Sequence, residues 1–146
     1  MFLASLISAV LITSPQAAPQ IELMLTGQGR FAQFAQPATI QTGEDGLTRM
    51  RALQVSDEPM QIGEHAYVGG WSWWAFDCSA NTGRRTDFAS VREDGHEGPS
   101  TPTREEMHLL YAGGDAAELG DVACGRTPVR IDARSLTEAV AMARQD

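Results

Sequence analysis

The sequence predicts an α+β fold, in which short C-terminal helices pack on one face of an antiparallel sheet of about four to six strands. Two observations indicate this class. The middle of the chain, from Arg30 to Val91, alternates short apolar runs with turn residues, as consecutive β-hairpins do. The last third instead places apolar residues at helical spacing behind two capping-box motifs. At 146 residues, the chain has the length of one domain.

The chain begins with an apolar run, Phe2 to Ile12, whose length is typical of a secretory signal and too short to span a bilayer. Pro15 interrupts this run, and small residues follow it. No Lys or Arg precedes the run and no clean A-x-A site follows it, so a buried N-terminal helix is the alternative. We expect a signal peptide at 1–18, a single sheet-and-helix domain at 19–125 and a helical tail at 126–146.

Turn residues divide the middle of the chain into strands. Ile21 to Leu25 is either a first strand or the end of the export signal. Asp45-Gly46 is a strong turn dipeptide, and Ser56 to Pro59 is expected to end the strand that follows it. The expected strands are Arg30 to Ala35, Leu47 to Val55, His65 to Cys78 and Arg84 to Val91.

The strand from His65 to Cys78 contains all three tryptophans and is the strongest apolar signal in the chain. Because side chains alternate along a strand, Trp74, Phe76 and Cys78 share one face, and Tyr67, Trp71 and Trp73 share the other. Helices on the first face would leave the second open, as a candidate binding or dimer face. The alternative is that the sheet curls or the tail helix covers this face. Gly69-Gly70 marks a bulge that can reverse the alternation before it.

Two capping boxes predict the helices. Asp115-Ala-Ala-Glu118 starts the first, which ends at Cys124, with Gly125 at the C-cap glycine position. Ser135-Leu-Thr-Glu138 starts the second within the tail.

The two cysteines, Cys78 and Cys124, lie 46 positions apart. In an exported chain two cysteines usually pair, and this bond would pin the first helix onto the central strand. Two free thiols in a cytosolic protein are the alternative.

Charge and hydropathy restrict the partners. With a net charge of −8, the chain is not expected to bind nucleic acid or anionic lipid, because both attract positively charged proteins. After the leader, no apolar run approaches the ~18 residues of a membrane span, so we expect no stable membrane insertion.

Catalytic motifs are missing from the sequence. The three histidines, His65, His96 and His108, lack the spacing of a zinc site, and Ser72 lacks the second glycine of a nucleophile elbow. We therefore expect no catalytic, cofactor-binding or metal-binding residues and no enzymatic activity. The alternative is an envelope enzyme or enzyme inhibitor, in which one of these histidines would meet acidic residues in a concave pocket.

Three motifs, Phe76-Asp-Cys78, Gly113-Gly-Asp-Ala-Ala-Glu118 and Ala123-Cys-Gly125, follow one another as they do in a known family. Over Arg30 to Gly125, the chain resembles the surface-adhesin protein E-like family of small exported bacterial proteins. The resemblance implies an antiparallel sheet tethered to a helix by a Cys78–Cys124 disulfide. It also implies a location in the periplasm or at the cell surface, a protein or cell-envelope ligand, and homodimers. None of the family's binding residues can be placed on this chain.

Overall fold

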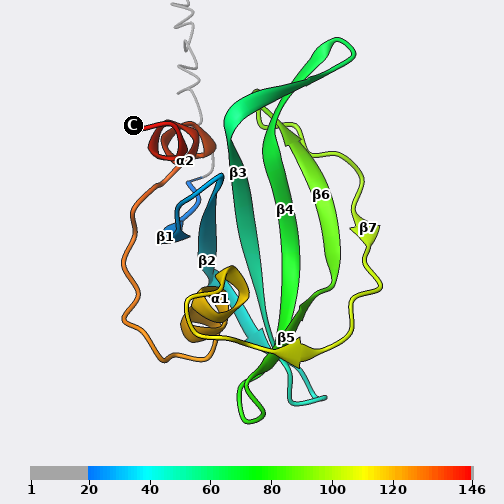
Figure 1. The fold of residues 1–146 in the computed structure, drawn as a ribbon, viewed down its shortest axis with the longest axis vertical. Coiled ribbons are helices and arrows are strands. Elements are labelled where there is room, and N and C mark those ends of the chain that lie inside the picture. Colours follow the sequence, from blue (N-terminus) through cyan, green and yellow to red (C-terminus); the bar gives the residue numbers. More distant parts are fainter. Residues whose placement is uncertain (1–19, 146) are drawn as a thin grey trace, which may run out of the picture.

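The computed structural model describes residues 20–145, so the expected signal peptide lies outside the described residues. Within this range the chain forms an eight-stranded antiparallel sheet and two helices (Figure 1), which confirms the α+β class. The strands are β1 (Met24–Gly27), β2 (Phe31–Thr42), β3 (Thr48–Ile62), β4 (His65–Asp77), β5 (Thr82–Arg85), β6 (Asp87–Arg92), β7 (Thr101–Pro102) and β8 (His108–Leu109). The helices are α1 (Asp115–Ala123) and α2 (Leu136–Ala143).

The first four strands form a meander in chain order, and β4 is its last strand, which pairs with β3 on one side and with β5 and β6 on the other. The segment expected as one strand, Arg84 to Val91, is split into β5 and β6 at Thr86. The backbone N–H and the hydroxyl of Thr86 both donate to the carbonyl of Trp73, at 2.8 and 3.1 Å. As a result, β5 pairs with the C-terminal half of β4 and β6 pairs with its N-terminal half.

Strand β3 continues past Ser56 to Pro59, where the sequence predicted its end. Beyond this segment, Met60 pairs with Tyr67, and the register shifts between Val55 and Met60. The hydroxyl of Ser56 contacts the carbonyl oxygens of Glu58 (2.6 Å) and Val68 (3.1 Å) and satisfies backbone groups at this irregularity. The β3–β4 hairpin therefore extends beyond the rest of the sheet (Figure 1).

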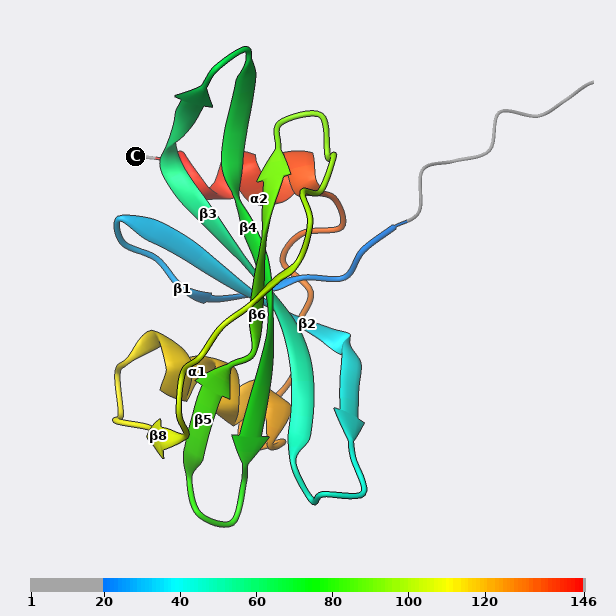
Figure 2. The same cartoon turned by 90° about the vertical axis from the view of Figure 1, so that its right-hand side faces the viewer.

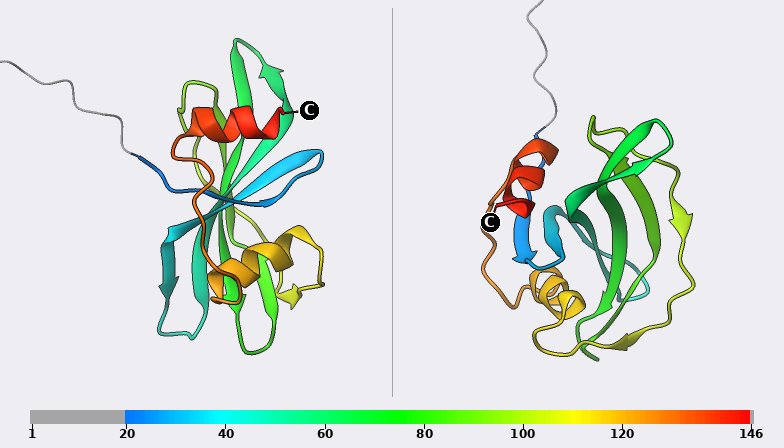
Figure 3. Two further views of the ribbon diagram at one scale, coloured as in Figure 1. Left: turned by 90° about the vertical axis from the view of Figure 1, so that its left-hand side faces the viewer. Right: turned by 45° about the horizontal axis from the view of Figure 1, so that its top comes forward.

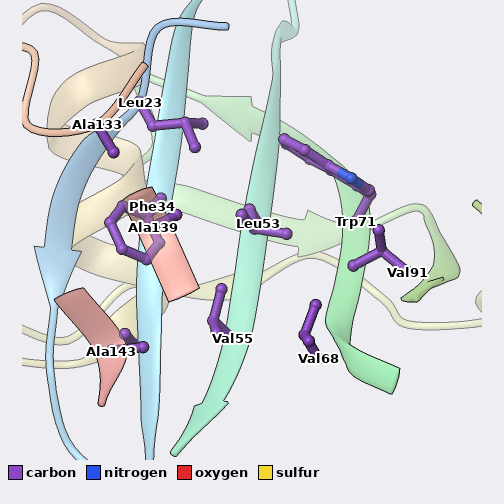
Figure 4. Packing of buried hydrophobic residues seen from close by; sticks show 11 residues of the cluster. Leu23, Phe34, Leu53, Val55, Val68, Trp71, Val91, Ala133, Ala139 and Ala143 are labelled. Carbon is purple, nitrogen blue, oxygen red and sulfur yellow. The ribbon is translucent and has the colours of Figure 1, made fainter. Parts of the chain in front are cut away.

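The two helices pack on opposite faces of the sheet. Residues paired across an antiparallel ladder share a face, and the next row along the strands shares the other. One row consists of Leu25, Phe34, Leu53 and Trp71, and the adjacent row consists of Met24, Ala35, Ala52 and Ser72. Phe34, Leu53 and Trp71 of the first row belong to the core cluster that contains Ala139 and Ala143 of α2 (Figure 4), and Leu25 packs against this cluster. Residues of the second row belong to the cluster that contains Leu119 and Val122 of α1.

The sequence predicted that both helices pack on the face of Trp74 and Phe76. This prediction is correct for α1. Helix α2 lies on the other face and, with Ala133, completes the core there. Figure 3 shows the two helices on either side of the β1–β2 hairpin. The segment after residue 125 thus supplies one of the two helical layers. Neither helix among residues 20–145 is long and apolar enough to cross a membrane.

The helix starts differ from each other. Ser135 caps α2 as expected, because its hydroxyl accepts the N–H of Glu138 at 3.1 Å. The expectation for Asp115 is corrected, since Gly114 is the N-cap residue of α1 and no side chain caps it. Gly113 adopts a left-handed φ of 84°, and the turn it forms brings Gly114 to the extended conformation from which the helix begins.

The disulfide between Cys78 and Cys124 is present, with an S–S distance of 2.04 Å and a Cα–Cα distance of 5.6 Å. It joins the residue after β4 to the C-cap residue of α1. The Arg126 guanidinium reinforces this junction by donating to the Cys78 carbonyl (2.9 Å) and to Asn81 (3.0 Å). The expected tether of helix to sheet is confirmed.

Candidate binding sites on the sheet

The two helices pack on opposite faces and at opposite ends of the sheet. Half of each face therefore has no helix packed on it. The α2 cluster takes Val68 and Trp71 from the N-terminal half of β4, whereas the α1 cluster takes Trp74 and Phe76 from its C-terminal half. The strongly twisted strands cross at the centre of the sheet, so the two helices lie at its opposite ends (Figure 2). Candidate binding surfaces are therefore expected on the two halves that the helices leave free.

Tyr67, Trp71 and Trp73, the candidate face predicted from the sequence, do not share one surface. The pairing register shifts between Tyr67 and Gly69, which confirms a bulge at the double glycine. Val68 belongs to the α2 cluster, so the neighbouring Tyr67 points to the α1 face, where it pairs with Met60. Trp71 is a core residue with only 5% of its surface exposed, and Trp73 is half-buried. A binding role for these three residues stays a prediction.

The free half of the α1 face contains an apolar hollow of about 220 Å³, the glycine groove. Its lining residues are Phe31, Gln54, Met60, Gly69, Gly70 and Phe88. The three large apolar side chains of this lining are exposed to solvent: Phe31 (41%), Met60 (44%) and Phe88 (37%). They come from strands β2, β3 and β6, so only the pairing register brings them together.

Gly69 and Gly70 cannot be replaced by larger residues without steric clashes. A Cβ atom on Gly70 would lie 2.2 Å from the ring of Phe88. A Cβ atom on Gly69 would lie 1.8 Å from the backbone oxygen of Gln54. The ring of Phe88 can therefore lie against bare backbone, and the double glycine was the one sequence signal that marked this region.

Two arginines stack on aromatic rings near the glycine groove: Phe31 lines the groove, and Tyr67 pairs with the groove residue Met60. The guanidinium carbon of Arg30 lies 5.8 Å from the ring centroid of Phe31, and that of Arg92 lies 5.9 Å from the ring centroid of Tyr67. Within residues 20–145 neither arginine forms an ion pair, unlike Arg49 or Arg51. A chain with a net charge of −8 thus carries two arginines without ion pairs near its exposed apolar hollow, although Arg92 also lines the His65 depression with Glu93 and Asp94. This combination can hold an apolar side chain and a neighbouring carboxylate.

On the α2 face, Trp71 lines a second and larger hollow of about 440 Å³, the Trp71 cavity. The Arg51 guanidinium stacks over the Trp71 ring at 4.3 Å and donates to Glu97 at 2.6 Å. Next to it, the Asp87 carboxylate accepts the N–H of Trp73 and the hydroxyl of Ser100, both at 2.6 Å. Glu97 and Asp87 therefore have structural partners already.

The histidines do not converge. His65 lines an open depression of about 380 Å³ together with Glu93 and Asp94, near the β3–β4 hairpin tip. His96 lies in the following loop, where its backbone N–H donates to Asp94 at 2.9 Å, and His108 belongs to β8. The described part of the chain holds no group of three His, Cys, Asp or Glu residues that could bind a metal ion. An enzymatic role stays an untested alternative.

Two aspartates have perturbed acidities, and local turns explain both. The Arg49 guanidinium donates to both carboxylate oxygens of Asp45, at 3.0 and 2.6 Å, and lowers the pKa of that carboxyl to about 2. The Ser79 hydroxyl, at 2.7 Å, and then the N–H of Ala80 lower the pKa of Asp77. Neither carboxyl lines the glycine groove or the Trp71 cavity.

Comparison with known proteins adds no relative: no family model, no curated protein and no solved structure matches this chain.

Proposed function

We propose that this protein is a non-enzymatic interaction protein of the bacterial cell envelope that binds a polypeptide partner at the glycine groove. One observation carries the proposal: Phe31, Met60 and Phe88 expose apolar surface together over a glycine floor. Grouped apolar exposure of this kind marks an interaction site, whereas single exposed apolar residues do not.

The size of the groove favours a polypeptide over a small ligand. Pockets that enclose drug-sized ligands measure about 300–1,000 Å³ and bury most of the ligand. The glycine groove measures about 220 Å³ and opens to the surface, so it accommodates about one apolar side chain of a larger partner. The nearby Arg30 and Arg92 favour acidic residues beside that side chain.

Two observations support a location outside the cytoplasm. The Cys78–Cys124 disulfide is typical of proteins that fold in oxidising compartments. The resemblance of the sequence to the surface-adhesin protein E-like family also favours the periplasm or the cell surface. In that setting the partner is a protein or another polypeptide component of the envelope or of its surroundings.

The proposal is tested with a synthetic peptide that carries one Phe between Asp and Glu residues, titrated into isotope-labelled protein and followed by NMR. We expect the backbone signals of Gly70 and Phe88 to shift. Replacement of the peptide's Phe by Ala should weaken binding at least tenfold, because the side chain in the groove provides most of the contact. Replacement of its acidic residues by Lys should also weaken binding.

Phe88→Ala and Leu109→Ala form a matched pair of variants. Both remove an exposed apolar side chain, but Leu109, 55% exposed, lies on β8 and does not line the groove. Only Phe88→Ala should weaken peptide binding. Equal effects of the two variants, or equal binding of the Ala peptide, would contradict the proposal. A dimer that Phe88→Ala dissociates in sedimentation would instead make a second copy of this chain the occupant.

A further inference from the structure

We propose that the Trp71 cavity binds a small amphipathic amine, with its apolar body against Trp71 and its ammonium group on Asp94. The cavity, at about 440 Å³, falls within the size range of small-molecule pockets. Four apolar side chains from separate parts of the chain line it: Ile21, Trp71, Val91 and Leu136. This site lies on the α2 face and is independent of the glycine groove.

The wall that carries the acidic residues is fixed without a ligand. In the turn after β6, the N–H of Arg92 donates to the carbonyl of His96 (2.9 Å), and the N–H of Gly98 donates to Ser90 (2.8 Å). Arg51 holds Glu97 from the sheet side at 2.6 Å. Because these bonds position the turn in advance, binding need not order it.

Asp94 supplies the free acceptor in this wall. Its Oδ1 accepts the backbone N–H of His96 at 2.9 Å, whereas no described residue donates to its Oδ2. Glu97, the other carboxylate of the lining, is neutralised by Arg51. A primary ammonium group can donate to the free oxygen of Asp94 with full charge complementarity.

An anionic ligand fits this cavity less well, although the N-terminus of α2 borders it through Ser135 and Leu136. Free N–H groups at a helix start attract anions. Here the Ser135 hydroxyl accepts the N–H of Glu138 at 3.1 Å, and the Glu138 carboxylate lies in the first turn. This local negative charge, together with the net charge of −8, favours a cation.

The test uses 2-phenylethylamine as the probe and 2-phenylethanol and 3-phenylpropionate as neutral and anionic analogues. Each is titrated into isotope-labelled full-length protein while the indole N–H signal of Trp71 is followed by NMR. We expect the amine to shift this signal and to bind at least tenfold more tightly than either analogue. An unshifted Trp71 signal at millimolar amine, or equal binding of the neutral analogue, would overturn the proposal.

Asp94→Asn and Glu93→Gln provide the matched variants. The side-chain amide oxygen that Asp94→Asn introduces can still accept the N–H of His96, so the turn is kept while the charge is lost. Glu93 is adjacent in sequence and lines the His65 depression but not the Trp71 cavity. Only Asp94→Asn should weaken amine binding by tenfold or more. Equal weakening by both variants would show that general acidity attracts the amine, and would overturn the assignment.

Discussion

Removal of the disulfide should cost this protein a large part of its stability. The perturbation is the double variant Cys78→Ala with Cys124→Ala. The bond closes a loop with a sequence separation of 46, for which the chain-entropy relation gives about 4 kcal/mol. Domains of this size have unfolding free energies of about 5–15 kcal/mol, so the variant should remain folded but unfold at markedly lower urea concentration.

Urea unfolding followed by tryptophan fluorescence measures this loss, and the wild-type protein reduced with dithiothreitol is the control in which no side chain is replaced. A loss below about 1 kcal/mol in both would refute the loop-entropy argument. Hydrogen exchange tests where the bond acts. Cys124 anchors α1, whereas α2 packs in the opposite cluster, so amides of α1 should lose more protection than amides of α2. Equal loss would show that the helices are not held separately.

Two further predictions concern β4 and the turn before β3. Gly69→Ala should destabilise the protein by several kcal/mol in thermal unfolding, because its Cβ would meet a β3 backbone oxygen at 1.8 Å. Gly29→Ala should not, because its Cβ would meet no atom of residues 20–145 within 4 Å. Asp45→Asn should destabilise the protein at pH 7. The pKa of Asp45 falls from 3.8 to about 2 on folding, so its stabilising contribution is complete above pH 3.8 and is lost as the pH falls through 2. The difference in urea midpoint between variant and wild type should therefore shrink from pH 4 to pH 2, and a constant difference would contradict the pairing with Arg49.

Local signals in the sequence predicted much of the fold. Alternation and turn residues placed β4 within one residue of its observed end, and the capping box at Ser135 gave the start of α2. The end of β3 was missed because Pro59 cannot donate to a ladder and normally ends a strand. In the structure the register shift between Val55 and Met60 accommodates Pro59, and pairing resumes beyond it.

The sequence left the placement of α2 open, with coverage of the Trp71 face as the stated alternative, because this placement depends on burial of both sheet faces. The neighbours Ala52 and Leu53 are both buried, each in a different cluster. A strand buried on one side alternates, whereas one buried on both sides reads as a continuous apolar run, which does not say which helix covers which side. The choice is made by long-range packing and by the twist of the sheet.

The candidate sites were predicted less well than the fold. The tryptophan-rich strand does border both hollows, but the bulge moves Tyr67 to the face opposite Trp71. Phe31, Met60 and Phe88 lie on three strands, and no local pattern connects them. Their proximity follows from the strand register and from the space that Gly70 leaves for the ring of Phe88.

The two proposed sites lie back to back across β4, because Gly70 lines the glycine groove and the next residue, Trp71, lines the Trp71 cavity. This geometry decides which substitutions can separate them. Trp71→Ala would remove a buried core side chain at a cost of about 3–5 kcal/mol, so a loss of binding in that variant would not distinguish a site from a damaged core. Phe88 and Asp94 are better targets, since each is partly or fully exposed and each borders only one of the two hollows. If Phe88→Ala abolished peptide binding alone and Asp94→Asn abolished amine binding alone, the two faces of the sheet would be shown to act independently.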